Sequence, residues 1–412
     1  MTDAVIVSTA RTPIGKAYRG ALNATEGATL LGHAIGEAVA RAKVDPKEVE
    51  DVVMGAALQQ GTTGGNIARK ALLRAGLPVT VGGTTIDRQC ASGLQAIALA
   101  ARSVIFDGVE IAVGGGGESI SLVQNEHANS FHAQDPALLK IKGEVYMPMI
   151  DTAEVVAKRY GISRERQDEY SLESQRRTAA AQQGGKFNDE LAPISTQMGV
   201  TDKATGAVSF KEITLSKDEG PRPDTSAEGL AGLKPVFERP WGQVTAGNSS
   251  QITDGASWVI LASEEAVTKH GLTPKAVIVD SQWAALDPSI MGLGPVMSAT
   301  ELLKRNKLSL GDIETWELNE AFATQVLGCL AAWNDEKFCR EILGLDGAAG
   351  PIDRAKLNVD GGAISLGHPV GCSGNRIVLH LVNAMKRLGT RRGIATECIG
   401  GGQGGAMLIE TV

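Results

Sequence analysis

The chain has 412 residues, of which 43% are hydrophobic, 21% charged and 4% aromatic, and it contains 50 glycines. This length favours two or three domains, and the composition is typical of an α/β protein with many tight turns between strands and helices. The net charge of −7 argues against long-range attraction to nucleic acid or to an anionic membrane, so we expect neither as a partner.

The cysteines and the lack of long apolar runs indicate the compartment. The spacing of the five cysteines fits neither a disulfide framework nor a zinc site, so we expect a reducing environment and no metal. No run approaches 18 consecutive apolar residues, and the first strand-like run begins at residue 4 without a charged and then apolar leader. We therefore expect a soluble, cytoplasmic protein. The cysteines are Cys90, Cys329, Cys339, Cys372 and Cys398.

The first quarter of the chain alternates strand and helix patterns. Apolar runs predict buried strands, and apolar residues at helical spacing predict helices that pack on them. In chain order we expect a strand over residues 4–9, a helix over 28–43, a strand over 51–58, a helix starting near residue 90, and a strand over 110–113 that runs into the glycines 114–117.

Cys90 stands at the start of one of these helices, in the sequence DRQCASGLQAIALAA. The helix is apolar or small on all sides, which predicts a buried position in the middle of a large domain. Unpaired amides and the positive end of the helix dipole would favour a thiolate there, so Cys90 is a candidate nucleophile. The alternative, a small hydrophobic side chain of the core, is favoured while Cys90 is considered alone.

The rest of the chain contains an insertion and then a second copy of the first pattern. Polar helices such as 164–183 and an acidic, proline-rich segment predict an exposed inserted domain over residues 121–247. Beyond it, a strand over 276–279 and a helix over 299–304 begin a second half, in which CSGNRIVLHLVNAMKRLG resembles CASGLQAIALAARSVIFDG. We expect two copies of one fold, with their buried helices starting near one another.

Three motifs of the second half carry candidate site residues. His368 lies among glycines before the second buried helix, where it can accept the proton of Cys90. Cys398 ends a strand before a glycine turn whose amides can approach a ligand, and Asn319 lies at a strand-to-helix corner. We expect His380, together with Arg376, Asn383 and Arg387, on a solvated polar face of its helix.

The motifs DRQCASGLQA, NEAFA, GGAISLGHPVGCSG and CIGGGQG, in this order and spacing, resemble those of the thiolases, the acyl-CoA acetyltransferases that cleave or form 3-ketoacyl-CoA. The resemblance covers the chain from its first strand to its last residue. It implies a five-layered α-β-α-β-α fold of two duplicated halves with an inserted loop domain. The implied domains are an N-terminal half (1–120 and 248–272), a loop domain on the CoA-binding side (121–247) and a C-terminal half (273–412).

The resemblance also implies the roles of individual residues. Cys90 is the acylated nucleophile, His368 activates it, Cys398 is the second acid/base, and Asn319 holds a water of one oxyanion hole. The amides of Cys90 and Gly400 form the other oxyanion hole. The implied substrates are acyl-CoA and CoA, with no bound cofactor and no metal, in a homodimer or homotetramer. Ser250, Ala246 and Met149 are the implied CoA contacts.

These residue types suit the chemistry by themselves. Cleavage of a carbon–carbon bond beside a ketone needs a nucleophile, donors for the oxyanion, and an acid that protonates the departing enolate. The sequence departs from the family at Gln251, where glycine is common, and at Asp360, where asparagine is usual. Pro148 replaces a histidine that is usual in acetoacetyl-CoA-forming members, so we expect thiolysis of longer chains rather than biosynthesis of acetoacetyl-CoA.

Other interpretations are less consistent with the motifs. The pattern G-x-G-x-x-G at residues 400–405 precedes a strand rather than a helix, which argues against a dinucleotide site. A decarboxylating ketoacyl synthase would need a second histidine in a catalytic context. A non-catalytic CoA- or lipid-binding relative would have lost one of the four candidate catalytic residues, and all four are present.

Overall fold

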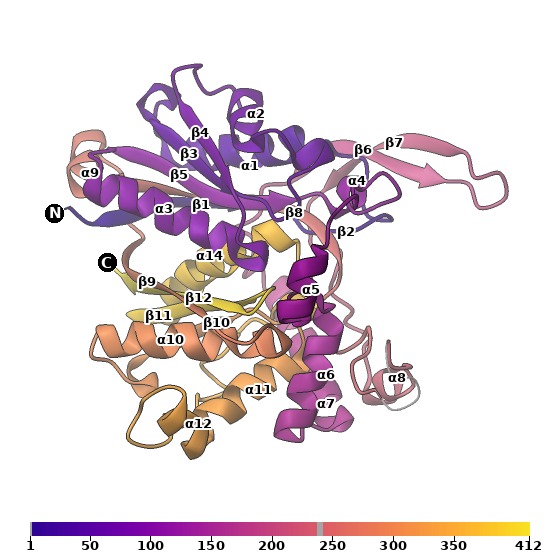
Figure 1. The fold of residues 1–412 in the computed structure, drawn as a ribbon. Helices are drawn as coiled ribbons and strands as arrows, with labels where there is room; N and C mark the ends of the chain where they lie inside the picture. Colours follow the sequence, from indigo (N-terminus) through magenta and orange to yellow (C-terminus); the bar gives the residue numbers. More distant parts are fainter. Residues whose placement is uncertain (1, 237–241) are drawn as a thin grey trace.

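The structure, a computed structural model, describes residues 2–236 and 242–412. Five of the residues assigned above to the inserted domain, 237–241, lie outside the described residues. Helices and strands alternate in both halves, and the two sheets lie one above the other in Figure 1.

The strands follow one continuous order, β10-β11-β12-β9-β1-β8-β5-β3-β4. The strands of the two halves are joined where β1 pairs with β9 over two residue pairs. The strand pairs on the two sides of this junction match. β3 is parallel to β5, as β10 is to β11. β8 is antiparallel to β5, as β12 is to β11. The strands are β1 (Ala4–Arg11), β2 (Gly15–Lys16), β3 (Asp51–Gly55), β4 (Gly82–Ile86), β5 (Ile111–Glu118), β8 (Thr253–Ser263), β9 (Ala276–Ala285), β10 (Thr315–Leu318), β11 (Arg392–Ile399) and β12 (Gln403–Thr411).

Helices cover both sheets and fill the space between them, which gives five layers (Figure 1). Three hydrophobic clusters occupy the spaces between the layers, and the central cluster holds α3 and α14. The expected five-layered α-β-α-β-α fold is therefore confirmed. The outer helices are α1 (Gly27–Ala42), α2 (Ile67–Arg74), α9 (Glu264–His270), α10 (Gly294–Arg305), α11 (Ala323–Asn334) and α12 (Glu336–Glu341), and the central ones are α3 (Ser92–Phe106) and α14 (Val370–Leu388), which follows the short α13 (Ala363–Leu366).

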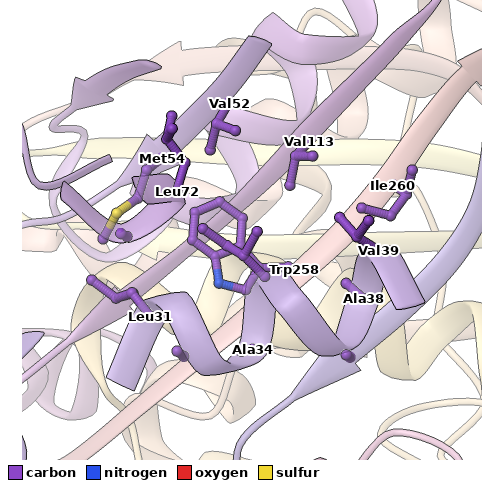
Figure 2. Close-up of a cluster of buried hydrophobic side chains, with 14 of the residues drawn as sticks. Leu31, Ala34, Ala38, Val39, Val52, Met54, Leu72, Val113, Trp258 and Ile260 are labelled. Atoms are coloured by element: carbon purple, nitrogen blue, oxygen red, sulfur yellow. The ribbon is translucent and has the colours of Figure 1, made fainter. Parts of the chain in front are cut away.

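The apolar stripe of α1 explains how an outer layer is held. Leu31, Ala34 and Ala38 recur at helical spacing and face Trp258 of β8, which is fully buried (Figure 2). Burial of each large side chain of this kind stabilises the fold by about 1.5–3 kcal/mol. The same pattern made the helix predictable from the sequence.

Glycines allow the two central helices to begin side by side. The expected strand at residues 110–113 continues through the glycines to Glu118. A methyl group on Gly116 would lie only 2.0 Å from the carbonyl oxygen of Gly371, in the first turn of α14. A side chain would push α14 away, so the glycines serve close packing, as their position in the sequence suggested.

The segment between β5 and β8 lies beside the layers rather than within them (Figure 1). It includes a hairpin of two exposed strands that the sequence analysis did not identify, because neither strand is strongly apolar. The elements of this segment are α4 (Ile120–Val123), α5 (Pro136–Lys142), α6 (Met149–Tyr160), α7 (Arg164–Gln183), β6 (Ile194–Thr201), β7 (Val208–Leu215) and α8 (Ala227–Ala231).

One helical stretch of the described residues, Gln89–Phe106, is long and apolar enough to cross a membrane by length and composition alone. It includes α3 and lies between the two sheets, where an all-apolar helix is a core helix.

Candidate active site

A cavity of about 1260 Å³ opens where the two halves and the inserted segment meet. It is lined by seven of the eight candidate site residues, which come from segments far apart in the chain. Asn319 is the eighth and lies outside the lining. The seven lining residues are Cys90, His368, Cys398, Gly400, Ser250, Ala246 and Met149.

Cys90 lies in a short 3₁₀ helix, Gln89–Ala91, that leads into α3. The preceding Gln89 has a φ of 48°, a left-handed conformation that is unfavourable for a residue with a side chain. A hydrogen bond of 2.6 Å from the Gln89 amide to Asp87 Oδ1 holds this turn. The backbone amides of Cys90 and Gly400 both act on the Cys90 sulfur and favour its charged form. Two backbone donors therefore converge at the candidate nucleophile.

The thiol of Cys90 is not more acidic than usual in the ligand-free site, contrary to the expectation from its place at a helix start. Burial and the nearby charge of Glu397 raise the pKa of Cys90 to about 12, although the two amide hydrogen bonds lower it. Burial disfavours the charged form more strongly than two amides favour it. A proton acceptor is therefore needed to form the thiolate.

His368 is the candidate for such an acceptor, because it lines the same cavity as Cys90. Its Nδ1 lies 2.6 Å from the Ser373 Oγ, and the Ser373 hydroxyl donates to the Pro369 carbonyl oxygen at 3.2 Å. Because the hydroxyl proton is used in this way, Nδ1 carries the proton and donates, and Nε2 is the basic nitrogen. Nε2 is buried and has no hydrogen-bond partner among the described residues. Burial lowers the pKa of His368 to about 4, so the imidazole is neutral at rest.

Ser373 was not singled out from the sequence, although it lies within the motif GHPVGCSG. The signal was present in the spacing, because residues five apart across a helix start can meet. Nothing in one sequence distinguishes this serine from the many serines that cap helices or pack in the core.

Asn319 follows β10 at the expected corner and is buried. Its Oδ1 accepts a hydrogen bond of 3.4 Å from Arg376 Nη2, while its Nδ2 has no partner among the described residues. The amide group is thus turned so that Nδ2 is left to donate. Arg376 also pairs with Glu317 at 3.6 Å and contributes to the lowered pKa of His368.

The expectation of a solvated polar face on α14 is wrong for Arg376 and His380, whereas Arg387, in the last turn of the helix, is exposed and Asn383 is half-buried. Arg376 and His380 are each only 1% exposed. His380 Nδ1 lies 2.5 Å from Glu190, and its Nε2 lies 3.4 Å from Asp360. These partners raise the pKa of His380 to about 10 despite its burial, so it is a buried cation. The error has a physical cause, since a helix between two sheets has no solvent-facing side and its charges must be paired.

Asp360, a departure from the family pattern, belongs to this buried cluster. It pairs with Lys186 at 2.8 Å and with Arg387 as well as lying near His380. Its effect is therefore on the packing of α14 and the inserted segment, and not on the cavity lining. Glu190 links the cluster to Arg11 of β1 at 3.0 Å.

Cys398 is fully buried near the end of β11 and lines the cavity close to Cys90. Burial raises its pKa well above the ordinary value, and the neighbouring Cys90 and Glu397 raise it further. In the turn that follows, Gly401 and Gly402 have φ values of 77° and 86°, which favour glycine. Cys398 is therefore a neutral thiol that can donate a proton to a group bound beside Cys90.

One part of the cavity lining is positively charged. This part contains Lys16, Arg19 and Arg222. Gln251 donates from Nε2 to the carbonyl oxygens of Gly220 and Ser365, both at 2.9 Å, and accepts from Arg222 at 3.3 Å. Gln251, the other departure from the family pattern, thus fixes the loops beside this part of the cavity. Within residues 2–236 and 242–412 no group of three metal-ligating side chains gathers.

Comparisons with known proteins identify the family of the chain. Residues 4–265 match the model of the thiolase N-terminal domain, and residues 272–411 match that of the thiolase C-terminal domain. The 3-ketoacyl-CoA thiolase of Bacillus subtilis (strain 168) is 40% identical over the whole of both chains. The acetyl-CoA acetyltransferase of Escherichia coli (strain K12) is also 40% identical, over 100% of this chain and 99% of its own.

Solved structures give the same result. The crystal structure of human mitochondrial 3-ketoacyl-CoA thiolase has a TM-score of 0.84 at 39% identity and covers 100% of this chain and 99% of its own. The structure of human mitochondrial 3-ketoacyl-CoA thiolase in complex with CoA has a TM-score of 0.83 at 39% identity, over 100% and 98%. The chain therefore belongs to the thiolase family of acyltransferases.

Proposed function

We propose that this thiolase cleaves 3-ketoacyl-CoA with a second molecule of CoA, giving acetyl-CoA and a shortened acyl-CoA, and that it prefers chains longer than acetoacetyl-CoA. The observation that carries the proposal is the convergence of Cys90, His368 and Cys398 on one cavity that has a cationic end and an apolar wall.

The first half of the proposed reaction makes the acyl-enzyme. His368 Nε2 takes the proton of Cys90, and the sulfur attacks the keto carbon. The keto oxygen becomes an oxyanion that the amides of Cys90 and Gly400 stabilise. As the oxyanion collapses, the carbon–carbon bond breaks, and the Cys398 thiol protonates the α-carbon of the departing acetyl-CoA enolate.

The second half transfers the acyl group to CoA. The Cys398 thiolate takes the proton of the incoming CoA thiol, and the CoA sulfur attacks the thioester carbon of acyl-Cys90. The amides of Cys90 and Gly400 again stabilise the oxyanion. Cys90 leaves as the thiolate and recovers its proton from His368, so each group returns to its starting state. Asn319 acts in the first half of the reaction, where its Nδ2 donates to the water that helps to hold the enolate oxygen.

The lining of the cavity supports both substrates. Phosphates of CoA are attracted by Lys16, Arg19 and Arg222 in the positively charged part of the lining. The wall from the inserted segment is apolar and includes Val145 and Met149. Met149 Sδ would lie 3.5 Å from a methyl group on Gly400, and Val145 Cγ2 3.9 Å from one on Gly401. A longer acyl chain would be buried against this wall at about 0.8 kcal/mol per CH₂.

A substrate panel tests the preference. The kcat/KM for 3-ketoacyl-CoA substrates of four to twelve acyl carbons should rise with length, and Val145→Phe should lower it most for the longest chains. Val200→Phe, on the exposed hairpin, is the matched control and should leave the profile unchanged. A maximum at four carbons would instead favour the alternative, a biosynthetic acetoacetyl-CoA thiolase. Product formation from a malonyl-type donor would favour a decarboxylating synthase.

We also propose the assembly, the location and the domain division that the sequence suggested. β4 is the last strand of the sheet order and its other edge is unpaired among the described residues, which supports a homodimer or homotetramer through this edge. All five cysteines are free, which supports a cytoplasmic location. The division into two halves is supported by the family match changing near residue 270, and the insertion over 121–247 is supported by the segment between β5 and β8 lying beside the layers (Figure 1).

A further inference from the structure

Glu397 is a buried acid that the mechanism above does not use. It precedes Cys398 on β11 and is fully buried. Neither of its carboxyl oxygens has a hydrogen-bond partner among the described residues. A carboxyl group in this situation strongly resists ionisation, because neither water nor a donor compensates its charge. Burial accordingly raises the pKa of Glu397 well above the ordinary value.

The carboxyl group lies where the two central helices begin. A methyl group on Gly374, in the first turns of α14, would lie 3.0 Å from Glu397 Oε2 and 2.5 Å from the backbone nitrogen of Leu94, near the start of α3. β11 also contacts the 3₁₀ helix that carries Cys90. Glu397 is thus placed beside the start of the helix that follows the nucleophile, and it does not belong to the cavity lining.

The charges around Glu397 and Cys90 are few. Arg376 of α14 lowers the pKa of Glu397, and Arg376 is itself paired with Glu317 of β10. The other titratable groups around the pair are two thiols, two carboxyl groups and one imidazole. The thiols are Cys398 on β11 and Cys372 on α14, and Glu397 acts on both of them as well as on Cys90. The remaining groups are Asp87 before the 3₁₀ helix, Glu118 of β5 beside Gly371, and His368, which lines the same cavity as Cys90.

We propose that Glu397 is a positioning residue that shares one negative charge with Cys90, so that the thiol of Cys90 stays protonated whenever the carboxyl group is ionised. The inference rests on the proposed role of Cys90 as the nucleophile. A carboxylic acid is intrinsically more acidic than a thiol, so the first proton lost from the pair as pH rises comes from Glu397. The resulting carboxylate opposes loss of the second proton, from Cys90.

This arrangement has a consequence for the resting enzyme. While the carboxyl group is protonated, Cys90 ionises by giving its proton to His368. Once the carboxyl group has lost its proton, its charge opposes ionisation of Cys90, so the enzyme does not accumulate the thiolate that alkylating and oxidising reagents attack.

The test is the pH dependence of iodoacetamide labelling at Cys90, followed by peptide mass spectrometry between pH 6 and pH 10.5. Glu397→Gln keeps the shape and removes the charge. It should move the rise in labelling down by at least one pH unit and label at least tenfold faster than the wild type at pH 9. Glu314→Gln removes an exposed carboxyl group of the same half and should keep the wild-type profile.

A second neutral variant and a second reagent complete the test. Glu397→Met fills a similar volume without polar atoms and, because the carboxyl group has no hydrogen bond to lose, should fold and show the same shift. Inactivation by hydrogen peroxide at pH 9 should accelerate in both variants. An unchanged labelling profile in either folded variant would overturn the inference. Since labelling needs no turnover, that result is distinguishable from a failure of the proposed thiolase reaction.

Discussion

Removal of the Ser373 hydroxyl should disable His368 without touching the substrate. In the structure the 2.6 Å contact between Ser373 Oγ and His368 Nδ1 leaves Nε2 as the basic nitrogen. Ser373→Ala leaves a buried N–H without an acceptor, which costs about 1–3 kcal/mol, and it allows the other tautomer. If the transition state for proton transfer is destabilised by this free energy, acylation slows by about 10- to 100-fold.

The assay is rapid-quench measurement of acetyl transfer from acetyl-CoA to Cys90, read by intact-protein mass spectrometry. Ser257→Ala is the matched control, because this buried serine donates to the Cys372 carbonyl oxygen of the same helix at 3.0 Å without contacting His368. It should acylate at nearly the wild-type rate. Acylation of Ser373→Ala at the wild-type rate, with both variants folded, would show that His368 needs no such support and would refute the reasoning.

Three further predictions concern other parts of the molecule. In the Cys398→Ala variant Cys90 should still be acetylated, but exchange of the acetyl-CoA methyl protons with deuterated solvent should be lost. The Cys90→Ala variant should form no acyl-enzyme. Exchange at the wild-type rate in Cys398→Ala would show that another group is the base. His380→Gln should lower the free energy of unfolding in urea by about 3 kcal/mol, because Glu190 and Asp360 lose a buried partner, and an unchanged midpoint would contradict this. Light scattering at micromolar concentration should give at least a dimeric mass, and a monomer would exclude pairing through β4.

The same buried ion pair predicts how stability depends on pH. The raised pKa of His380, about 10, contributes stability that is fully present below its unfolded value of about 6.5 and is lost as pH rises towards 10. The pKa of Glu190 is lowered to about 2 by His380 and Arg11 although burial opposes this, so its contribution is present above about 4.5 and is lost as pH falls towards 2. Urea titrations should therefore place the maximum of these two contributions between about pH 4.5 and 6.5. In the His380→Gln variant the free energy of unfolding should depend less on pH between about 6.5 and 10. A His380→Gln variant with the wild-type alkaline slope would contradict the assignment.

Features with a local cause were predictable from the sequence. The start of the helix near Cys90, the glycine turn after Cys398 and the corner at Asn319 follow from residues next to one another in the chain. The meeting of Cys90 and His368 at one cavity followed from the recognised repeat of the two halves, because the two buried helices were expected to start near one another.

Features that depend on distant partners were not predictable. The polar stripe of α14 has the spacing of a solvated face, and only Glu190 from the inserted segment and Asp360 from before α13 explain its burial. The acidity of Cys90 was misjudged for a similar reason. The effect of the helix start is visible in the sequence, whereas the burial and the charge of Glu397, three hundred residues away, are not.

The most direct measurement of the central claim is mass spectrometry of the enzyme after a single exposure to a long-chain 3-ketoacyl-CoA, with the second CoA withheld. We predict one acyl group, shorter than the substrate by two carbons, bound to Cys90, and its complete release as acyl-CoA when CoA is added. An unmodified Cys90, or an acyl group on Cys398 that CoA releases, would contradict the account.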